Sequence, residues 1–331
     1  MSAPSSTLTT TAGPTSAERY LDAERTLWTR YGLAPAERFV ELREPRARLR
    51  VLDIGFGEPV LFVHGLLGPD AFAPLVRELR DFRCLVLDRP GWGRSTRVDY
   101  ASSRHGPLVA NLLSGVLVGL GLDRAHVVGA SVGTLWALRF AEAHPESVDR
   151  VVLIGAGPML DELRVPPWLR LMASPLGALM SRHTSLGTLR AILRQAGHAE
   201  SLDDGRIPDE LLAWRLAAAR DTEAMRSERD MLRDSLVSWP TGRWRAGALF
   251  APPDLRAIPQ HALYLHASAD PAGRIEIARR ITDLLPHGEL DIIDGHSHEP
   301  WLEDPRGVAT RVSSFLQADQ GLRAAAARAR P

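Results

Sequence analysis

The segment that decides the fold reads Ala125-His126-Val127-Val128-Gly129-Ala130-Ser131-Val132-Gly133, followed by Thr134-Leu135-Trp136-Ala137-Leu138-Arg139-Phe140-Ala141. Its first residues predict a short strand, and the apolar residues after the serine recur at helical spacing until His144-Pro145. A G-x-S-x-G sequence between a strand and a helix indicates a sharp turn that presents the serine at the end of a sheet. We therefore interpret Ser131 as a nucleophile. A Gly/Ser loop without a chemical role is the alternative.

The length and composition of the chain exclude several classes of protein. The chain has 331 residues, of which 45% are hydrophobic, so it is long enough to bury a large core. Its formal net charge is zero, and no basic field is available to attract nucleic acid or an anionic membrane. All 40 basic residues are arginine, which excludes Schiff-base chemistry by lysine. The single cysteine, Cys84, lies in an apolar run, where we expect a buried structural thiol.

Localisation and partners are predicted from what the sequence lacks. No apolar run approaches the roughly 18 residues of a membrane span, and the N-terminus has neither the basic nor the apolar region of a signal peptide. We expect a cytoplasmic monomer or homodimer that acts on a small molecule, needs no cofactor, and binds neither nucleic acid nor a membrane.

Strand-like and helix-like segments alternate along most of the chain, which predicts an α/β fold with a mostly parallel sheet covered on both faces. The expected strands are 38–43, 48–54, 59–63, 83–87, 125–128, 150–154, 261–266 and 289–293, and the expected helices of the core are 72–79, 108–120, 134–141, 274–285 and 305–315. The alternation stops at Gly155-Ala156-Gly157-Pro158, and residues 158–250 contain helical patterns but no convincing strand.

The predicted organisation is therefore a core with an inserted all-helical lid. It comprises an N-terminal extension with one helix (1–33), a core in two parts (34–157 and 251–316), the lid (158–250) and a C-terminal tail (317–331).

A serine hydroxyl needs partners before it can attack a carbonyl carbon. A histidine must take its proton, a carboxylate must orient that histidine, and backbone N–H groups must bind the oxyanion. Asp270 follows the strand at 261–266 and is the preferred acid, while Asp161 and Asp254 are alternatives. The base is expected after the last strand, where His296 and His298 compete.

Residues 38–316, apart from the insertion, resemble the α/β-hydrolase fold superfamily. Its members usually read G-H-x-P-[WH]-L-E-x-P after the last strand, and this chain reads His298-Glu299-Pro300-Trp301-Leu302-Glu303-Asp304-Pro305. The resemblance implies that His298 is the base. Ser297 stands where the family usually has glycine, which keeps His296 as an alternative base or a residue that contacts substrate.

Two further segments are similar to the same family. His64-Gly65-Leu66-Leu67-Gly68 matches its oxyanion loop, and Asp88-Arg89-Pro90-Gly91-Trp92-Gly93-Arg94-Ser95 matches a loop beside the site. The resemblance implies that the N–H groups of Leu66 and Val132 form the oxyanion hole. It also implies that His64 braces its loop and that Asp88 is structural.

The serine itself narrows the activity. Members of the family that open epoxides or displace halide need an aspartate at this position, and members that cleave carbon–carbon bonds often carry asparagine before the serine, where this chain has Ala130. We expect a carboxylesterase-like serine hydrolase that cleaves an ester, thioester or lactone of a mainly apolar small molecule. The alternatives are a carbon–carbon bond hydrolase and a non-hydrolytic cyclase, lyase or small-molecule receptor that uses the same site.

The lid and the histidine loop supply the remaining candidates. Four tryptophans of the lid either pack its helices together or line an apolar pocket: Trp168, Trp214, Trp239 and Trp244. Candidate substrate contacts are His64, Gly65, Trp168, Trp214, His296 and Trp301. The pair His296-x-His298, with Asp294 and Glu299 beside it, is rich in side chains that bind metals. A catalytic metal site needs a third ligand at a recognisable spacing, and none follows this pair, so we expect no metal.

Overall fold

The computed structural model describes residues 14–318 except 103–104, 156–158, 161–163 and 182. Within these residues, eight strands form one sheet in the order β1-β2-β4-β3-β5-β6-β9-β10. They are β1 (Ala36–Arg43), β2 (Arg46–Gly55), β3 (Glu58–Val63), β4 (Phe82–Leu87), β5 (Ala125–Ala130), β6 (Val148–Ile154), β9 (His261–Ala267) and β10 (Gly288–Ile293). All neighbouring pairs from β4 to β10 are parallel, while β1 and β2 form an antiparallel edge. The predicted mostly parallel sheet is confirmed.

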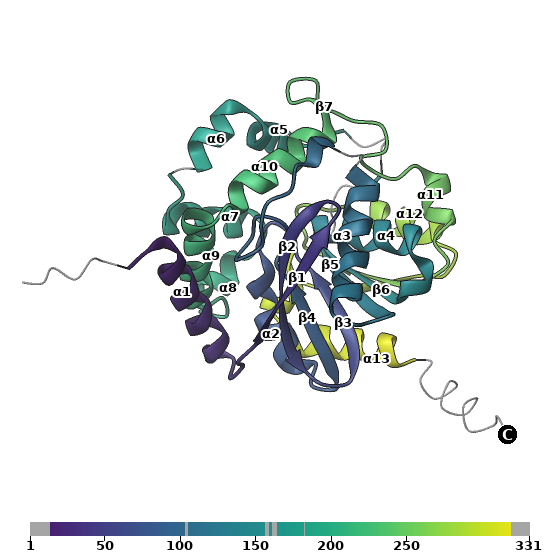
Figure 1. Cartoon of the computed structure of the whole chain (residues 1–331), viewed down its shortest axis with the longest axis horizontal. Coiled ribbons are helices and arrows are strands. Elements are labelled where there is room, and N and C mark those ends of the chain that lie inside the picture. Colours follow the sequence, from purple (N-terminus) through teal and green to yellow (C-terminus); the bar gives the residue numbers. More distant parts are fainter. Residues whose placement is uncertain (1–13, 103–104, 156–158, 161–163, 182, 319–331) are drawn as a thin grey trace, which may run out of the picture.

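Helices cover both faces of this sheet (Figure 1). One face packs on α3 (His105–Gly119), α4 (Val132–Ala143) and α12 (Ile275–Leu284), and the other on α2 (Ala73–Glu78) and α13 (Pro305–Gln317). The central strands are buried on both faces, which explains their continuous apolar sequences. Short helices complete the core: η1 (Pro69–Phe72), η2 (Tyr100–Ser102), η3 (Pro145–Ser147), η4 (Pro300–Leu302) and α11 (Pro252–Arg256). Cys84 is buried in β4, and burial raises the pKa of its thiol to about 12.

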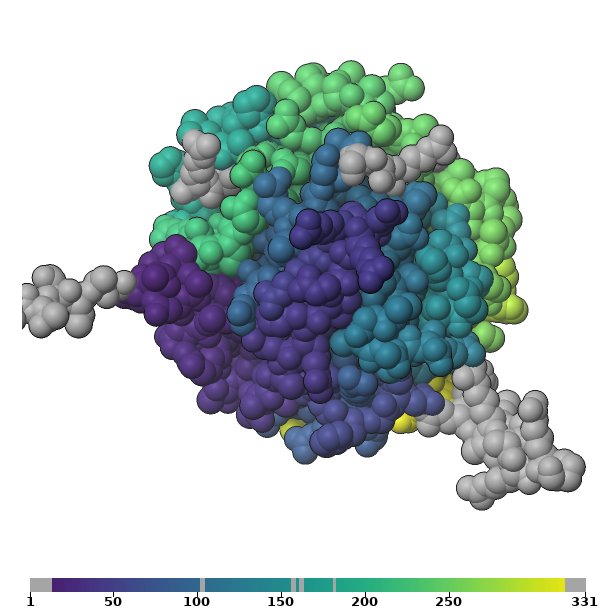
Figure 2. All heavy atoms as spheres, in the orientation of Figure 1, coloured from purple at the N-terminus to yellow at the C-terminus, as the bar shows by residue number. Residues whose placement is uncertain are grey.

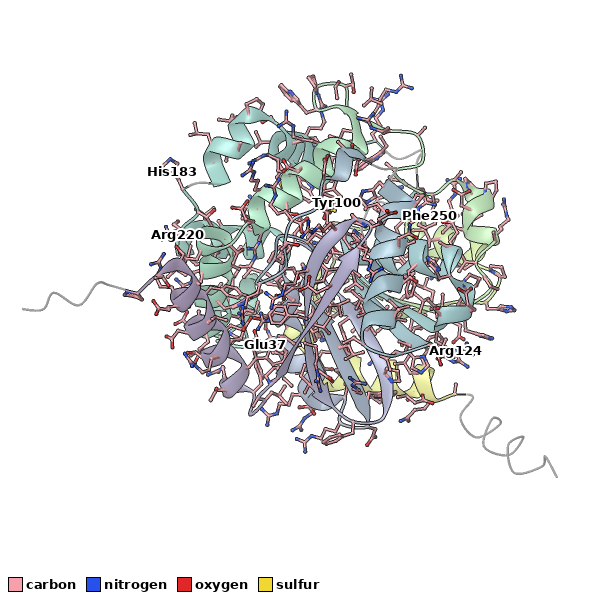
Figure 3. The ribbon with its side chains drawn as sticks, in the orientation of Figure 1. Glu37, Tyr100, Arg124, His183, Arg220 and Phe250 are labelled. Carbon is pink, nitrogen blue, oxygen red and sulfur yellow. The ribbon has the colours of Figure 1, made fainter. Side chains whose placement is uncertain are left out.

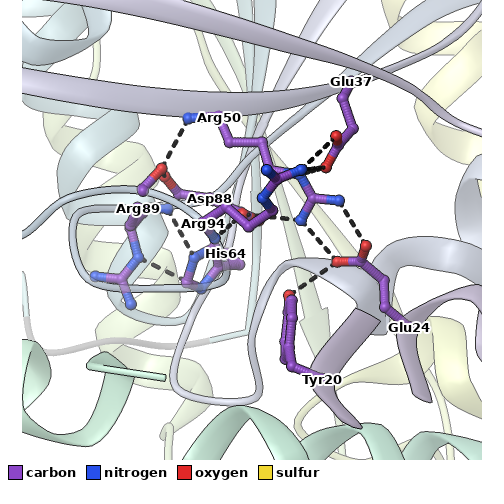
Figure 4. A network of polar contacts seen from close by, with 9 residues as sticks. Tyr20, Glu24, Glu37, Arg50, His64, Asp88, Arg89 and Arg94 are labelled. Atoms are coloured by element: carbon purple, nitrogen blue, oxygen red, sulfur yellow. Dashed lines mark hydrogen bonds and ion pairs between the residues drawn. The ribbon is translucent and has the colours of Figure 1, made fainter. Parts of the chain in front are cut away.

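Helix α1 (Ser16–Arg30) is tied to the core by a buried polar network (Figure 4). The Arg50 guanidinium donates to both oxygens of Glu24, at 2.7 and 2.5 Å, and to Asp88 at 3.2 Å. The Tyr20 hydroxyl donates to Glu24 at 2.9 Å. Asp88 also accepts the Arg94 N–H at 3.1 Å, so it lies within the network that joins α1 to the end of β4.

Residues 158–250 are here called the inserted segment. The two ends of this segment lie side by side, near Met159 and Phe250. The Phe250 N–H donates to the Met159 carbonyl at 2.8 Å, and Leu160 and Phe250 form a parallel bridge. Figure 3 labels Phe250. The described part of the segment contains α5 (Pro167–Ala173), α6 (Pro175–Ser181), α7 (Leu186–Gln195), α8 (Ala199–Asp203), α9 (Asp209–Asp221) and α10 (Ala224–Ser235). Figure 2 shows its teal and green atoms side by side along the top of the view.

The inserted segment also contains two short strands, β7 (Leu236–Ser238) and β8 (Arg243–Trp244), which pair antiparallel. The prediction of a strand-free segment was therefore wrong in this detail, because runs of two and three residues carry too little periodicity to be recognised. The predictions for residues 1–13 and 319–331 lie outside the described residues. No helix in the described ranges is both long and apolar enough to span a membrane.

Candidate active site

Ser131 lies in a strained turn between β5 and α4. Its backbone has φ 50° and ψ −120°, and it is the one non-glycine residue with positive φ among those described. The flanking glycines are required by packing, since a Cβ on Gly133 would lie 2.0 Å from the Val63 carbonyl oxygen and one on Gly129 would lie 2.5 Å from the Gly133 carbonyl oxygen. The turn therefore has the geometry that the G-x-S-x-G sequence predicts.

The structure brings Ser131, Asp270 and His298 together. The three residues follow β5, β9 and β10, whose carboxyl ends lie at the same edge of the parallel sheet. Ser131 Oγ is 3.1 Å from His298 Nε2, and His298 Nδ1–H donates to Asp270 Oδ2 at 2.9 Å. Asp270 is held in turn by the Ala272 N–H, which donates to its Oδ1 at 2.7 Å. This arrangement can remove the serine proton and hold it on an oriented imidazole.

Two carboxylates influence the imidazole of His298. Burial lowers the pKa of His298, but the neighbouring Glu299 carboxylate and the hydrogen bond to Asp270 outweigh burial and raise the pKa to about 9. The protonated form is thus stabilised, which is the form that appears when a serine gives up its proton.

The loop that contains Gly65 and Leu66 lies directly beside the serine. A Cβ on Gly65 would be only 2.6 Å from Ser131 Cβ, so the close approach requires glycine. Val132 is the first residue of α4, so its N–H has no intrahelical acceptor four residues earlier. Leu66 follows Gly65 in this loop and Val132 follows Ser131, and the oxyanion hole formed by their N–H groups stays a prediction.

His64 is buried and makes contacts within the protein. The Arg89 backbone N–H donates to His64 Nε2 at 3.2 Å (Figure 4). His64 Nδ1–H donates to the Gly65 carbonyl at 2.7 Å. Burial, and then the charge of Arg89, lowers the pKa of His64 well below its ordinary value. These contacts hold the loop beside Ser131, which agrees with the bracing role that the resemblance implies.

Arg215 is a part of this region that the sequence analysis missed. It lies on α9, is buried, and donates from Nη2 to the Leu66 carbonyl at 2.7 Å. Its Nη1 has no hydrogen-bond acceptor among the described residues. Burial lowers the pKa of Arg215 to about 10. Helical spacing could have revealed it, because Leu211 and Ala218 lie four residues before and three residues after it on the buried face.

A buried ion pair joins the same loops to the inserted segment. Arg89 pairs with Glu228 of α10, and the Trp92 indole N–H donates to the same Glu228 oxygen at 2.6 Å. Arg89 Nη2 also donates to the Gly65 carbonyl at 3.2 Å. Figure 3 shows Tyr100, the first residue of η2, near the middle of the view between the core and α10. The inserted segment thus contributes side chains that fix the loops around Ser131.

The structure separates the competing bases and acids. His296 is partly exposed, and its Nδ1–H donates to the Asp294 carbonyl at 2.7 Å, whereas His298 faces Ser131. Asp254 accepts the Ala251 N–H at 3.0 Å at the start of α11, and Asp161 lies outside the described residues. No group of three or more His, Cys, Asp or Glu side chains in the described ranges is placed to hold a metal ion.

The three tryptophan candidates have different positions. Trp214 is buried beside the oxyanion loop, since a Cβ on Gly68 would lie 2.5 Å from its ring. Trp168 is 51% exposed on α5. Trp301 stacks on Phe72 and donates its indole N–H to the Ala71 carbonyl at 2.7 Å, so its indole is committed to packing against η1. Only Trp214 is thereby placed near the Ser131 loops.

Comparisons with known proteins agree with this fold. A family model described as alpha/beta hydrolase fold matches residues 58–305. A 2-hydroxy-6-oxo-2,4-heptadienoate hydrolase from Pseudomonas putida is 29% identical over 276 residues, which cover 81% of this chain and 92% of that protein.

Solved structures show the same architecture. Naproxen esterase from Bacillus subtilis aligns with a TM-score of 0.70 at 17% identity and covers 92% of this chain and 100% of its own. A meta-cleavage product hydrolase from Pseudomonas fluorescens aligns with a TM-score of 0.68 at 21% identity and covers 85% of this chain and 97% of its own. At these identities the structural likeness concerns the fold alone.

Proposed function

Because this chain belongs to the alpha/beta hydrolase fold family, we propose that it is a serine hydrolase that cleaves a carbon–carbon bond in a small keto acid. Ser131 is the nucleophile, His298 the base, and Asp270 the residue that orients His298. The inserted segment is the lid that covers the reacting groups. The acyl-enzyme formed on Ser131 is then released by water.

The observation that carries this proposal is the buried guanidinium of Arg215. Nη1 of Arg215 has no acceptor within the described part of the chain, and the charge of Glu228 offsets the cost of burial only in part, so a further anion that accepts from Nη1 would stabilise the guanidinium. Arg215 holds the Leu66 carbonyl, so a carboxylate bound to it would lie close to the loop beside Ser131. The P. putida relative is named for a 2-hydroxy-6-oxo-dienoate, which has both a carboxylate and a keto group. Such a compound has no ester or amide bond, so its hydrolysis must break a carbon–carbon bond.

The reaction follows from the positions of the three side chains. Ser131 Oγ attacks the keto carbon while His298 Nε2 takes its proton, and the N–H groups of Leu66 and Val132 stabilise the oxyanion. The adjacent carbon–carbon bond breaks, its electron pair passes into the conjugated acid, and the His298 imidazolium returns the proton to that fragment. A water molecule, deprotonated by His298, cleaves the acyl-enzyme to give a carboxylic acid.

Ester, thioester or lactone hydrolysis is the second candidate. The observation that favours it is Ala130, which stands before the serine and offers no polar side chain. The same nucleophile, base and oxyanion donors suffice for acyl transfer from an ester.

One experiment separates the two candidates. Purified protein is incubated in ¹⁸O-labelled water with 2-hydroxy-6-oxohepta-2,4-dienoic acid and, separately, with p-nitrophenyl butyrate. We expect acetate that carries one ¹⁸O atom, a five-carbon dienoic acid, and a weaker esterase activity. Rapid ester cleavage without loss of the dienoic acid would support the second candidate. Ser131→Ala should remove both activities, and undiminished turnover would overturn the assignment of the nucleophile.

A further inference from the structure

A second carboxylate lies beside the imidazole of His298. Oε1 of Glu299 is 3.9 Å from His298 Nε2, on the side of the ring that faces Ser131. Asp270 contacts the opposite nitrogen, Nδ1, at 2.9 Å. The side chain of Glu299 is only 10% exposed, so water screens this interaction weakly.

The other oxygen of Glu299 is paired with a histidine from the inserted segment. His198 is completely buried at the start of α8, where its Nε2–H donates to Glu299 Oε2 at 2.9 Å and its Nδ1–H donates to Glu303 Oε1 at 2.9 Å. Burial lowers the pKa of His198, but the hydrogen bonds to both carboxylates outweigh it and raise the pKa to about 9. The ring therefore has one carboxylate oxygen on each nitrogen, which favours its protonated form, and the Glu299 backbone N–H also lies 3.3 Å from Nε2.

Hydrogen bonds between the residues next to His198 and those next to Glu299 hold the two side chains together. The Ser297 hydroxyl donates to the Gly197 carbonyl at 2.8 Å, and the Ser297 N–H donates to Glu303 Oε2 at 3.0 Å. The His298 N–H donates to the Ala196 carbonyl at 3.4 Å. The segment that leads into α8 is thus bound to the loop that positions His298.

The charges around the His298 ring have opposing effects. The carboxylates of Asp270 and Glu299 favour its protonated form, and the His198 imidazolium opposes it. His266 is a further titratable neighbour from β9; burial lowers its pKa, the charge of Asp270 opposes this, and the charge of His298 adds to the lowering. Removing Glu299 or removing His198 should therefore move the protonation of His298 in opposite directions.

We propose that Glu299 is a positioning residue that stabilises the His298 imidazolium on its Ser131 side, and that His198 of the inserted segment sets how strongly Glu299 acts. The inference rests on the proposed function, because it assumes that His298 is the base for Ser131. When Ser131 gives up its proton, the positive charge on His298 is shared between Asp270 at Nδ1 and Glu299 near Nε2. The position of His198 at the start of α8 determines how much of the Glu299 charge is neutralised.

The test measures how the rate of fluorophosphonate labelling at Ser131 depends on pH, because labelling requires neutral His298 and no natural substrate. In the unaltered protein the rate should fall as pH drops through the pKa of His298. In Glu299→Gln the midpoint of this fall should move to lower pH by about one unit or more. In His198→Gln it should move to higher pH, because the opposing positive charge is lost. Asp294→Asn, in the same loop, is the matched control and should leave the midpoint unchanged.

Each outcome bears on a different claim. If the unaltered protein labels Ser131 and the midpoints of both variants equal the unaltered midpoint, or move in the same direction, the inference about Glu299 is overturned while the proposed function stands. If the unaltered protein is not labelled at all, the proposed function itself fails. Thermal unfolding reports whether the variants fold. Should Glu299→Gln not fold, the upward shift in His198→Gln decides alone, since that variant retains Glu299.

Discussion

Arg215 of α9 donates a 2.7 Å hydrogen bond to the carbonyl oxygen of Leu66, 149 positions earlier in the chain. A helix of the inserted segment thereby holds the loop that carries a predicted oxyanion donor. The proposed substrate site is built jointly by the core and this segment, so changes in α9 and α10 should alter catalysis as well as stability.

Replacing Arg215 should discriminate between acidic and neutral substrates. In Arg215→Gln, we expect kcat/KM for the dienoic acid to fall about 10- to 100-fold more than kcat/KM for p-nitrophenyl butyrate, because a charged hydrogen bond contributes about 1.5–3 kcal/mol. Arg190→Gln, at a half-exposed arginine of α7 that pairs with Asp209, is the matched control and should change neither value. Equal losses on both substrates would show that Arg215 acts only through the Leu66 loop.

The two histidines after β10 should differ sharply in their importance. His298→Ala should reduce kcat by about 10⁴-fold or more, because Ser131 then has no base. His296→Ala should retain activity within a few-fold, since its ring faces the Asp294 carbonyl. Steady-state rates of both variants provide the measurement, and a reversed order would assign the base to His296.

The two candidate acids that the structure describes, Asp270 and Asp254, should also differ in their effect on kcat. Asp270→Asn should lower kcat by about 10⁴-fold, because the amide cannot stabilise the His298 imidazolium. Asp254→Asn, at the start of α11, should leave kcat unchanged. The activity of each variant is compared at equal amounts of folded protein, as judged by circular dichroism. An inactive Asp254→Asn beside an active Asp270→Asn would contradict the assignment.

The turn at Ser131 should not accept a larger residue. Gly133→Ala would place a methyl group 2.0 Å from the Val63 carbonyl oxygen. Moving the backbone of β3 away from this methyl group would cost free energy. We expect the free energy of unfolding to fall by about 1–3 kcal/mol, with loss of activity. In Gly187→Ala the new methyl group meets only Ser185 Oγ, at 3.7 Å, so its unfolding free energy should be unchanged or higher. Urea titrations of both variants measure the difference.

The buried network around Glu24 and Asp88 (Figure 4), together with the buried Asp70 of η1, should make stability depend on pH. Burial, and then the charges of Glu24 and Asp88, raises the pKa of Asp70 well above its ordinary value, and burial raises the pKa of Asp88 to about 6. The folded state therefore retains protons that the unfolded state has lost above pH about 4. The stability that these groups contribute is fully present below that pH and is lost as pH rises through their folded-state pKa values.

Asp70→Asn removes one of these protonations. Its free energy of unfolding relative to the unaltered protein should therefore rise as the pH increases above about 4, by up to about 1.4 kcal/mol for each pH unit. Asp22→Asn, on the exposed face of α1, should show no such trend. Urea midpoints at several pH values provide the test, and parallel pH profiles for Asp70→Asn and the unaltered protein would show that Asp70 carries no raised pKa.

Much of the core could be predicted from local patterns. The apolar runs of β3, β4, β5 and β9 indicate strands that are buried on both faces. The G-x-S-x-G turn can be recognised in the sequence because only glycine fits beside the serine at these two positions. The order of Ser131, Asp270 and His298 follows from their places after successive parallel strands. The choice between His298 and His296 rested on resemblance, and the structure supplies its geometric basis, since only His298 faces Ser131.

The sequence by itself thus determined the parallel sheet, the position of the strained serine and a short list of partners, because these depend on neighbours within a few residues. Tertiary structure alone decided which side chains from the inserted segment reach the site. Arg215 and Leu66 are 149 positions apart, and His198 and Glu299 are 101 apart. Burial and charge pairing across such distances depend on how helices pack on the core, and no local spacing encodes that packing.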